Sequence, residues 1–172
     1  MSIYLNKLLG TVAKMSADYF ARVQNTPSYE GIKISAFPKY NQENNYQIVA
    51  KSLKLIETVS PVSYNRVKKH INIIFLCDLR KGQSKYYYNQ KCLCVSKHNI
   101  EKAFFPNKAI VQLMAYWLIY SSAYGAIMAK GLVHSSIIVK RINKCCDKAG
   151  CRFMERLMKK VNEKQRTDQQ IN

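Results

Sequence analysis

Cysteine and histidine are the residues of this chain with the greatest capacity for metal or nucleophilic chemistry. Cys92 and Cys94 are separated by one residue, and His98 follows four residues later. The remaining cysteines are Cys77, Cys145, Cys146 and Cys151. Zinc sites usually use cysteine pairs of wider spacing, whereas alternate residues of a strand share one face and can pack together in a core. We therefore predict no metal site and no cofactor.

The histidines do not suggest a catalytic group either. His70, His98 and His134 are scattered, and none follows a recognisable pattern with an acid and a nucleophile. A Ser-His-Asp triad assembles in space, so the sequence leaves that arrangement open. The six glycines form no cluster of the kind that cradles phosphate. The sequence predicts a protein that is not an enzyme.

Interleaved cations and tyrosines form the most suggestive surface stretch. Its members are Arg80, Lys81, Lys85, Tyr86, Tyr87, Tyr88, Lys91 and Lys97. Cations beside aromatic rings suit the RNA backbone and stacked bases, and Tyr and Arg are also common at protein interfaces. Because Tyr86 and Tyr88 would lie opposite Tyr87 on a strand, one face could instead be core and the other a lysine-protected edge. Both interpretations remain open.

The apolar pattern predicts an α+β fold that is mostly helical and forms one domain over residues 1–172. Helices are expected over 3–24, 46–59, 63–69, 97–105, 107–130 and 136–164. The first of these is amphipathic. Pro61 should separate the second from the third, and Gly131 is placed to end the fifth. The polar tail, 165–172, is expected to fray.

Three segments predict a small sheet. Residues 71–77 form a short apolar run rich in β-branched side chains, which indicates a buried strand. A hairpin is expected from 85–88 and 91–95, turning at Asn89 and Gln90. A short extended piece is expected at 32–36.

The central helix is uncharged over 21 residues, from Ala109 to Ala129. That length could cross a bilayer. Tyrosines near the middle argue against a membrane span, because Tyr and Trp prefer the interfaces of a membrane. A buried core helix explains the same composition. We predict a long buried central helix and expect no membrane partner.

Several short motifs resemble small bacterial zincin-like metallopeptidases of the HExxH type. They are Tyr29-Glu30-Gly31-Ile32, Phe37-Pro38, Gly131-Leu132, and a last-helix pattern of Arg141, Ile142, Cys146, Ala149 and Phe153. The resemblance covers about residues 29–160. It implies zincin-like helices around a small antiparallel sheet.

The defining zinc motif of that family is missing. HExxH grips Zn²⁺ with two histidines on one helix face and uses the glutamate as a general base. Tyr116, Trp117 and Tyr120 occupy those three positions here, and Asn143 and Gly150 replace two acidic positions of the last helix. The resemblance therefore implies a pseudoenzyme. Tyr116, Tyr120 and Tyr124 also recur at four-residue steps, as a packed aromatic stripe would.

The chain is strongly basic, with 28 Lys and Arg against 10 Asp and Glu for a net charge of +18. Most of the excess, +15, lies in residues 61–172. Such a positive charge favours an anionic partner, namely nucleic acid, an acidic protein face or an anionic membrane. The alternative is that the charge only keeps the protein soluble. Residues 1–24 lack the features of a signal peptide, so we expect a cytoplasmic protein with reduced cysteines.

These observations lead to three functional hypotheses. The first is a non-catalytic protein-binding module, most specifically an immunity or inhibitor protein that neutralises a cognate toxin by docking on its acidic face. The second is an RNA-binding protein that uses the basic Tyr/Lys hairpin, although no known RNA-binding motif is present. The third is a residual or altered hydrolase.

Overall fold

The computed structural model describes residues 27–37, 42–77, 84–96, 107–131 and 136–171. Its elements are β1 (Ser28–Tyr29), β2 (Ile32–Phe37), α2 (Gln42–Val59), α3 (Pro61–His70), β3 (Ile73–Cys77), β4 (Lys85–Tyr87), β5 (Cys92–Ser96), α5 (Asn107–Met128) and α6 (Ser136–Ile171). The helices predicted over 3–24 and 97–105 lie outside the described residues, as do His98 and His134.

The five strands form one mixed sheet in the order β1-β2-β3-β5-β4. The central strands β2, β3 and β5 are parallel, whereas β1 and β4 pair antiparallel at the two edges. Parallel neighbours need a crossover connection, and α2 followed by α3 supplies it between β2 and β3. The predicted hairpin is confirmed as β4 and β5, with its turn at residues 88–91.

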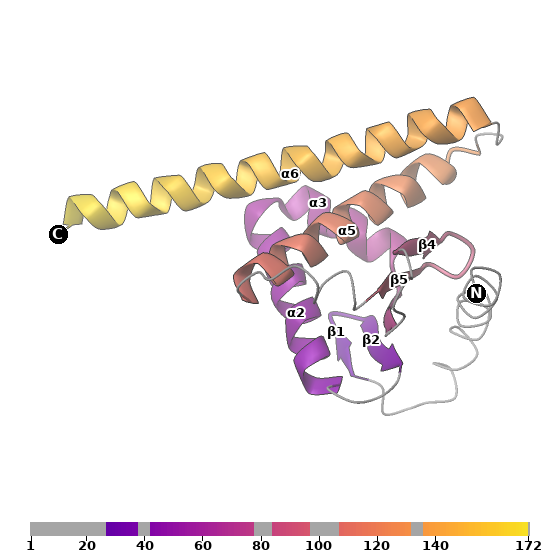
Figure 1. Cartoon of the computed structure of the whole chain (residues 1–172), viewed down its shortest axis with the longest axis horizontal. Coiled ribbons are helices and arrows are strands. Elements are labelled where there is room, and N and C mark those ends of the chain that lie inside the picture. Colours follow the sequence, from indigo (N-terminus) through magenta and orange to yellow (C-terminus); the bar gives the residue numbers. More distant parts are fainter. Residues whose placement is uncertain (1–26, 38–41, 78–83, 97–106, 132–135, 172) are drawn as a thin grey trace.

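The helices pack together on one face of the sheet (Figure 1). Alternate residues of the strands point toward them, and Ile34, Ile74 and Leu93 are fully buried in a core shared with α2, α3, α5 and α6. The other face is buried as well, since Phe75, Cys92 and Cys94 are at most 7% exposed. The Cys92 and Cys94 sulfurs lie 3.9 Å apart there, so the prediction that these residues pack in a core is confirmed.

Local sequence explains where α3 begins. Ser60 is extended, and its hydroxyl accepts a hydrogen bond from the Ser63 amide at 3.3 Å, which caps the helix. Pro61 takes the first helical position, where its missing N–H is not needed. Pro61 therefore ends α2 and starts α3, as predicted.

Helix α5 lies at the centre of the helical layer, with α2 and α3 on one side and α6 on the other (Figure 1). Met114, Leu118 and Ile119 on its core face are at most 1% exposed. Ile110–Met128 is long and apolar enough to cross a membrane by length and composition alone. In the structure it packs between other helices, and 44% of this stretch is buried.

The predicted α+β fold, mostly helical with a small sheet and a long central helix, is confirmed. Two details are wrong. The sheet is mixed, whereas an antiparallel sheet was predicted, because the β3 segment pairs with β2 and β5 in parallel. The tail predicted to fray from residue 165 is instead helical through Ile171, because Gln and Arg in this segment favour helix and no Gly or Pro interrupts it.

The C-terminal end of α6 projects beyond the rest of the fold (Figure 1). Every side chain from Asn162 to Gln170 is exposed, whereas Phe153 and Leu157 earlier on the same helix are 3% exposed. The packed part of α6 therefore ends near Val161. The last turns of the helix add surface and charge without adding to the core.

Truncation before residue 165 tests this division of α6. We expect loss of residues 165–172 to leave the free energy of unfolding unchanged to within about 0.5 kcal/mol, because exposed positions contribute little to stability. Leu157→Ala, by contrast, should cost about 2–5 kcal/mol as a large-to-small change in the core. Urea unfolding followed by circular dichroism measures both. A truncated chain as destabilised as Leu157→Ala would mean that the projecting end belongs to the core.

Candidate functional site

Helices α5 and α6 meet along an aromatic seam that contains all the positions of the missing zinc motif. The Tyr116 hydroxyl donates to Oδ1 of Asp147 at 2.5 Å, and the Tyr120 hydroxyl donates to Oδ1 of Asn143 at 2.9 Å. Trp117 lies between them on α5, with its ring centroid 5.6 Å from that of Tyr116 and 5.7 Å from that of Tyr120. The side chains at the three motif positions thus pack edge-on against each other.

Gly150 allows the two helices to approach closely at Tyr116. A Cβ atom added to Gly150 would lie 2.5 Å from Cε2 and 2.6 Å from Cδ2 of the Tyr116 ring. No side chain larger than hydrogen fits there unless the ring moves. The structure therefore pairs Tyr116 with Gly150 and Tyr120 with Asn143, so the five positions singled out in the sequence do come together.

The aromatic side chains of the seam are engaged in packing and in hydrogen bonds. Burial and the hydrogen bond to Asp147 raise the pKa of the Tyr116 phenol, and burial also raises the pKa of Tyr120. Both hydroxyls therefore stay protonated and act as hydrogen-bond donors. Among the described residues, no group of three or more His, Cys, Asp or Glu side chains could hold a metal ion.

A second buried contact joins α3, α5 and α6 near Cys146. Arg66 Nε on α3 donates to the Ser122 hydroxyl on α5 at 3.3 Å, and burial lowers the pKa of its guanidinium. Burial raises the pKa of the Cys146 thiol to about 12, although nearby Arg66 acts in the opposite direction. A thiol with so high a pKa is a poor nucleophile. The cluster connects the three helices and offers no thiolate.

The hairpin divides the predicted tyrosine surface into two parts. The Tyr86 hydroxyl donates to the backbone oxygen of His70 at 2.6 Å. A Cβ atom on Gly125 would lie 2.9 Å from this hydroxyl oxygen, so Gly125 makes room for it. Tyr86 is therefore anchored against α3 and α5. It cannot serve as a freely exposed stacking platform.

The outer side of the hairpin keeps part of the predicted surface. The Lys85 ammonium lies 5.0 Å from the centre of the Tyr87 ring, within the range of a cation–π contact. Lys91 is exposed at the turn with a positive φ of 49°, and Tyr88 is half-buried. Arg80, Lys81 and Lys97 lie outside the described residues. The described hairpin thus exposes Lys85 and Lys91, whereas Tyr87 is half-buried like Tyr88.

A small hollow opens where this hairpin meets α5 and α6. Its volume is about 180 Å³. The lining comprises Ser84, Lys85, Tyr86, Trp117, Tyr120, Ser121, Tyr124 and Asn143. Four of these eight side chains are aromatic, and three of the others carry a hydroxyl or an amide. The hollow therefore combines ring surfaces with hydrogen-bonding groups and a lysine.

Helix α6 carries a regular row of cations that the sequence analysis did not single out. It consists of Lys140, Lys144, Lys148, Arg152, Arg156, Lys160 and Lys164, and we call it the α6 basic row. All seven are exposed, although the Lys160 ammonium donates to the Thr58 carbonyl oxygen on α2 at 3.1 Å. Each four-residue step turns about 40° around a helix, so the row winds from the solvent side of α6 toward α2. Each four-residue step advances about 6 Å along a helix, so the row extends over roughly 36 Å. The four-residue spacing of these cations in the sequence was the signal that could have revealed it.

The α6 basic row is weakly balanced by acidic groups. Helix α6 contains ten Lys and Arg and four Asp and Glu, a net charge of +6. Among the described residues the recorded ion pair is Lys68 with Glu30, at 4.0 Å and far from α6. Like charges four residues apart repel on a helix. The row is therefore a concentrated positive surface on one helix.

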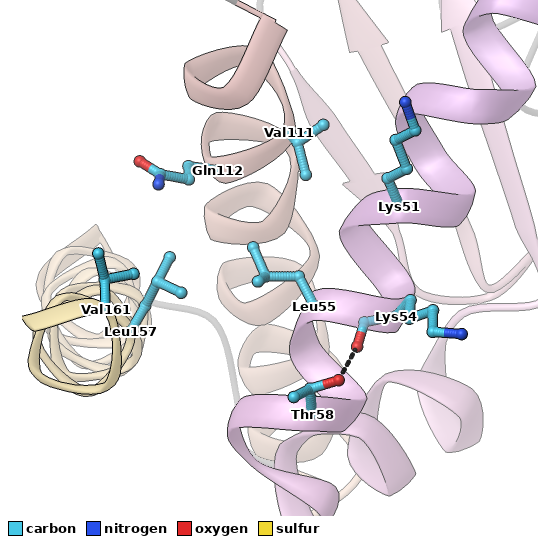
Figure 2. A pocket seen from close by; sticks show the side chains of 8 residues that line it. All are labelled: Lys51, Lys54, Leu55, Thr58, Val111, Gln112, Leu157 and Val161. Atoms are coloured by element: carbon cyan, nitrogen blue, oxygen red, sulfur yellow. Dashed lines mark hydrogen bonds between the residues drawn. The ribbon is translucent and has the colours of Figure 1, made fainter. Parts of the chain in front are cut away.

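A larger groove lies on the other side of α6, between this helix, α2 and α5. Its volume is about 490 Å³, and its walls include Leu55, Val111, Leu157 and Val161 (Figure 2). Lys51 and Lys54 of α2 point away from α6 in this view, so they do not extend the α6 basic row.

The chain matches no family model, no curated protein and no solved structure. The site must therefore be interpreted from its own geometry.

Gly150→Ala tests the close packing of the seam. The new methyl group would overlap the Tyr116 ring, so we expect a loss of about 1–3 kcal/mol in the free energy of unfolding. Tyr116→Phe is the matched control, because it keeps the ring and removes only the hydrogen bond to Asp147, at a cost of about 0.5–1.5 kcal/mol. Chemical denaturation of both variants measures the difference. Full stability of Gly150→Ala would show that the helices do not approach this closely.

Proposed function

We propose that this chain is a non-catalytic binding protein that holds a single-stranded nucleic acid along α6. The observation that carries the proposal is the α6 basic row, which places seven exposed cations at regular intervals on one helix. Nucleic acids present phosphates at regular intervals, and protein cations that replace their counterions supply most of the sequence-independent affinity.

The chemistry of the row supports nucleic acid over an acidic protein partner. The fully buried centre of a protein interface is depleted of charge and relies on apolar or aromatic anchors. The solvent face of α6 is mostly polar and charged, and its projecting end, 162–170, has no apolar side chain. A surface of this kind gains affinity from many separate phosphate contacts rather than from one buried centre.

The closed seam between α5 and α6 supports the non-catalytic part of the proposal. Tyr116 and Tyr120 pack against Trp117 and donate hydrogen bonds to α6, and none of the three is a metal-binding histidine. On this proposal the chain is a zincin-like pseudoenzyme that acts in the cytoplasm. The five cysteines with described side chains are thiols rather than disulfides, as a reducing compartment requires.

Charge reversal on α6 tests the proposal. The variant carries Lys144→Glu, Lys148→Glu and Arg152→Glu. We expect its affinity for an end-labelled single-stranded 12-mer to fall at least tenfold at low salt. The slope of log affinity against log salt should decrease by about 2, since each phosphate contact on a single strand contributes about 0.7. Fluorescence anisotropy at several salt concentrations measures both quantities.

A control with the same change in net charge isolates the position of the cations. Lys51→Glu, Lys54→Glu and Lys69→Glu replace three exposed lysines on α2 and α3. This control should keep most of the affinity of the native chain. Equal losses in the two triple variants would mean that only net charge matters, and the role of α6 would be refuted. Absence of binding by the native chain at low salt would refute nucleic-acid binding itself.

An immunity or inhibitor protein that docks on an acidic toxin domain is the second candidate. Ile137 and Met158 support it, because they are 65% and 48% exposed on α6 and could anchor a protein partner between the cations. A pull-down from nuclease-treated native lysate tests it. Capture of a stoichiometric acidic protein that is lost with Met158→Glu would favour this candidate. Loss of all bound material after nuclease treatment would favour nucleic acid.

A further inference from the structure

The aromatic hollow between the hairpin, α5 and α6 has the size and lining of a site for one flat aromatic ring with polar edges. Its rings form two edge-to-face pairs. Tyr86 and Tyr124 lie 6.1 Å apart at 75°, and Trp117 and Tyr120 lie 5.7 Å apart at 64°. These pairs come from β4 and α5, which are firmly packed elements. The ring surfaces are therefore held in place before any ligand arrives.

The polar groups of the hollow have hydrogen-bonding capacity left over. The Asn143 carbonyl oxygen is used by Tyr120, which leaves both amide hydrogens of Asn143 available. The Ser84 hydroxyl is buried at the wall and has no hydrogen-bond partner within the described part of the chain. The exposed Asn143 amide is therefore the group that could bond to the polar edge of a ligand.

One lysine lines this hollow, and two more lie close in sequence to Asn143 on α6. Lys85 belongs to its lining and is exposed on the hairpin. Lys144 follows Asn143 directly on α6, and Lys140 lies one turn before it. Both lysines belong to the α6 basic row, so the hollow lies beside the N-terminal end of that row. A ligand in the hollow could remain attached to a chain of phosphates that continues along α6.

We propose that the hollow holds one unstacked nucleobase of a single strand while Lys85, Lys140 and Lys144 contact the adjacent phosphates. This inference rests on the proposed function. Every base has a π-face that can lie against tyrosine or tryptophan, and its polar edge can bond to hydroxyl and amide groups. Other anionic polymers, such as an acidic peptide, would satisfy the lysines and leave the aromatic hollow empty.

The chain contains a natural reporter for this site, because Trp117 is its only tryptophan. A base that enters the hollow should quench Trp117 fluorescence. The probes are an end-labelled single-stranded deoxyadenosine 12-mer, an abasic 12-mer with the same phosphates, and adenosine monophosphate. We expect the base-bearing strand and the mononucleotide to quench Trp117, whereas the abasic strand should bind by anisotropy without quenching.

Two variants separate the hollow from general effects on the fold. Tyr124→Leu removes one ring from the hollow, whereas Tyr46→Leu removes another half-buried tyrosine on α2. Tyr124→Leu should lower the affinity for the base-bearing strand about 5- to 100-fold, which is the usual effect of losing one stacked base. Tyr46→Leu should leave that affinity unchanged. Asn143→Ala at an exposed position provides a second test of the hollow if Tyr124→Leu does not fold.

The outcomes distinguish this inference from the proposed function. Equal affinity and equal quenching for the base-bearing and abasic strands would overturn the nucleobase site and leave binding along α6 intact. If no strand binds, the proposed function fails, and titration with adenosine monophosphate still decides whether the hollow accepts a base. No quenching by the mononucleotide at millimolar concentration, together with identical losses in Tyr124→Leu and Tyr46→Leu, would refute the site.

Discussion

The close antiparallel packing of α5 against α6 is the contact on which the rest of this molecule depends. It requires a glycine at 150, because the Tyr116 ring fills the space that any larger side chain would occupy. Tyr116 and Tyr120 then connect the two helices through Asp147 and Asn143. Once α6 is held in this position, its opposite side must face solvent. The packing of one side of α6 against α5 therefore explains why the opposite side is polar.

The same packing determines what the aromatic residues can do. Tyr116 holds α5 and α6 together. Trp117, Tyr120 and Tyr124 also border the hollow beside the hairpin. Tyr86 reaches this hollow from β4 because Gly125 leaves room for its hydroxyl near His70. Two glycines thus permit two close approaches on opposite ends of the aromatic stripe. A stripe that resembles ordinary core in sequence becomes partly core and partly surface.

Local signals were sufficient to predict much of this fold. The apolar run at 71–77, the proline at 61 and the glycine at 131 each indicate a nearby element or boundary, and the structure has β3, the α2–α3 junction and the end of α5 there. Strand order was not predictable in this way, because parallel pairing of β2 with β3 depends on contacts between segments separated by two helices. The hollow escaped the sequence analysis for the same reason, since its lining comes from three separate parts of the chain. The α6 basic row differs, because its spacing is already visible in the sequence.

The free end of α6 has a thermodynamic consequence. From Asn162 onward the helix has no tertiary partner, and short helical segments without packing are only marginally stable in water. Repulsion along the basic row lowers that stability further at low ionic strength. A polyanion that neutralises these charges would lengthen the helix as it binds. Part of the binding free energy would then offset the cost of ordering the end of α6. The length of helix in contact with the ligand would increase as more of the ligand binds.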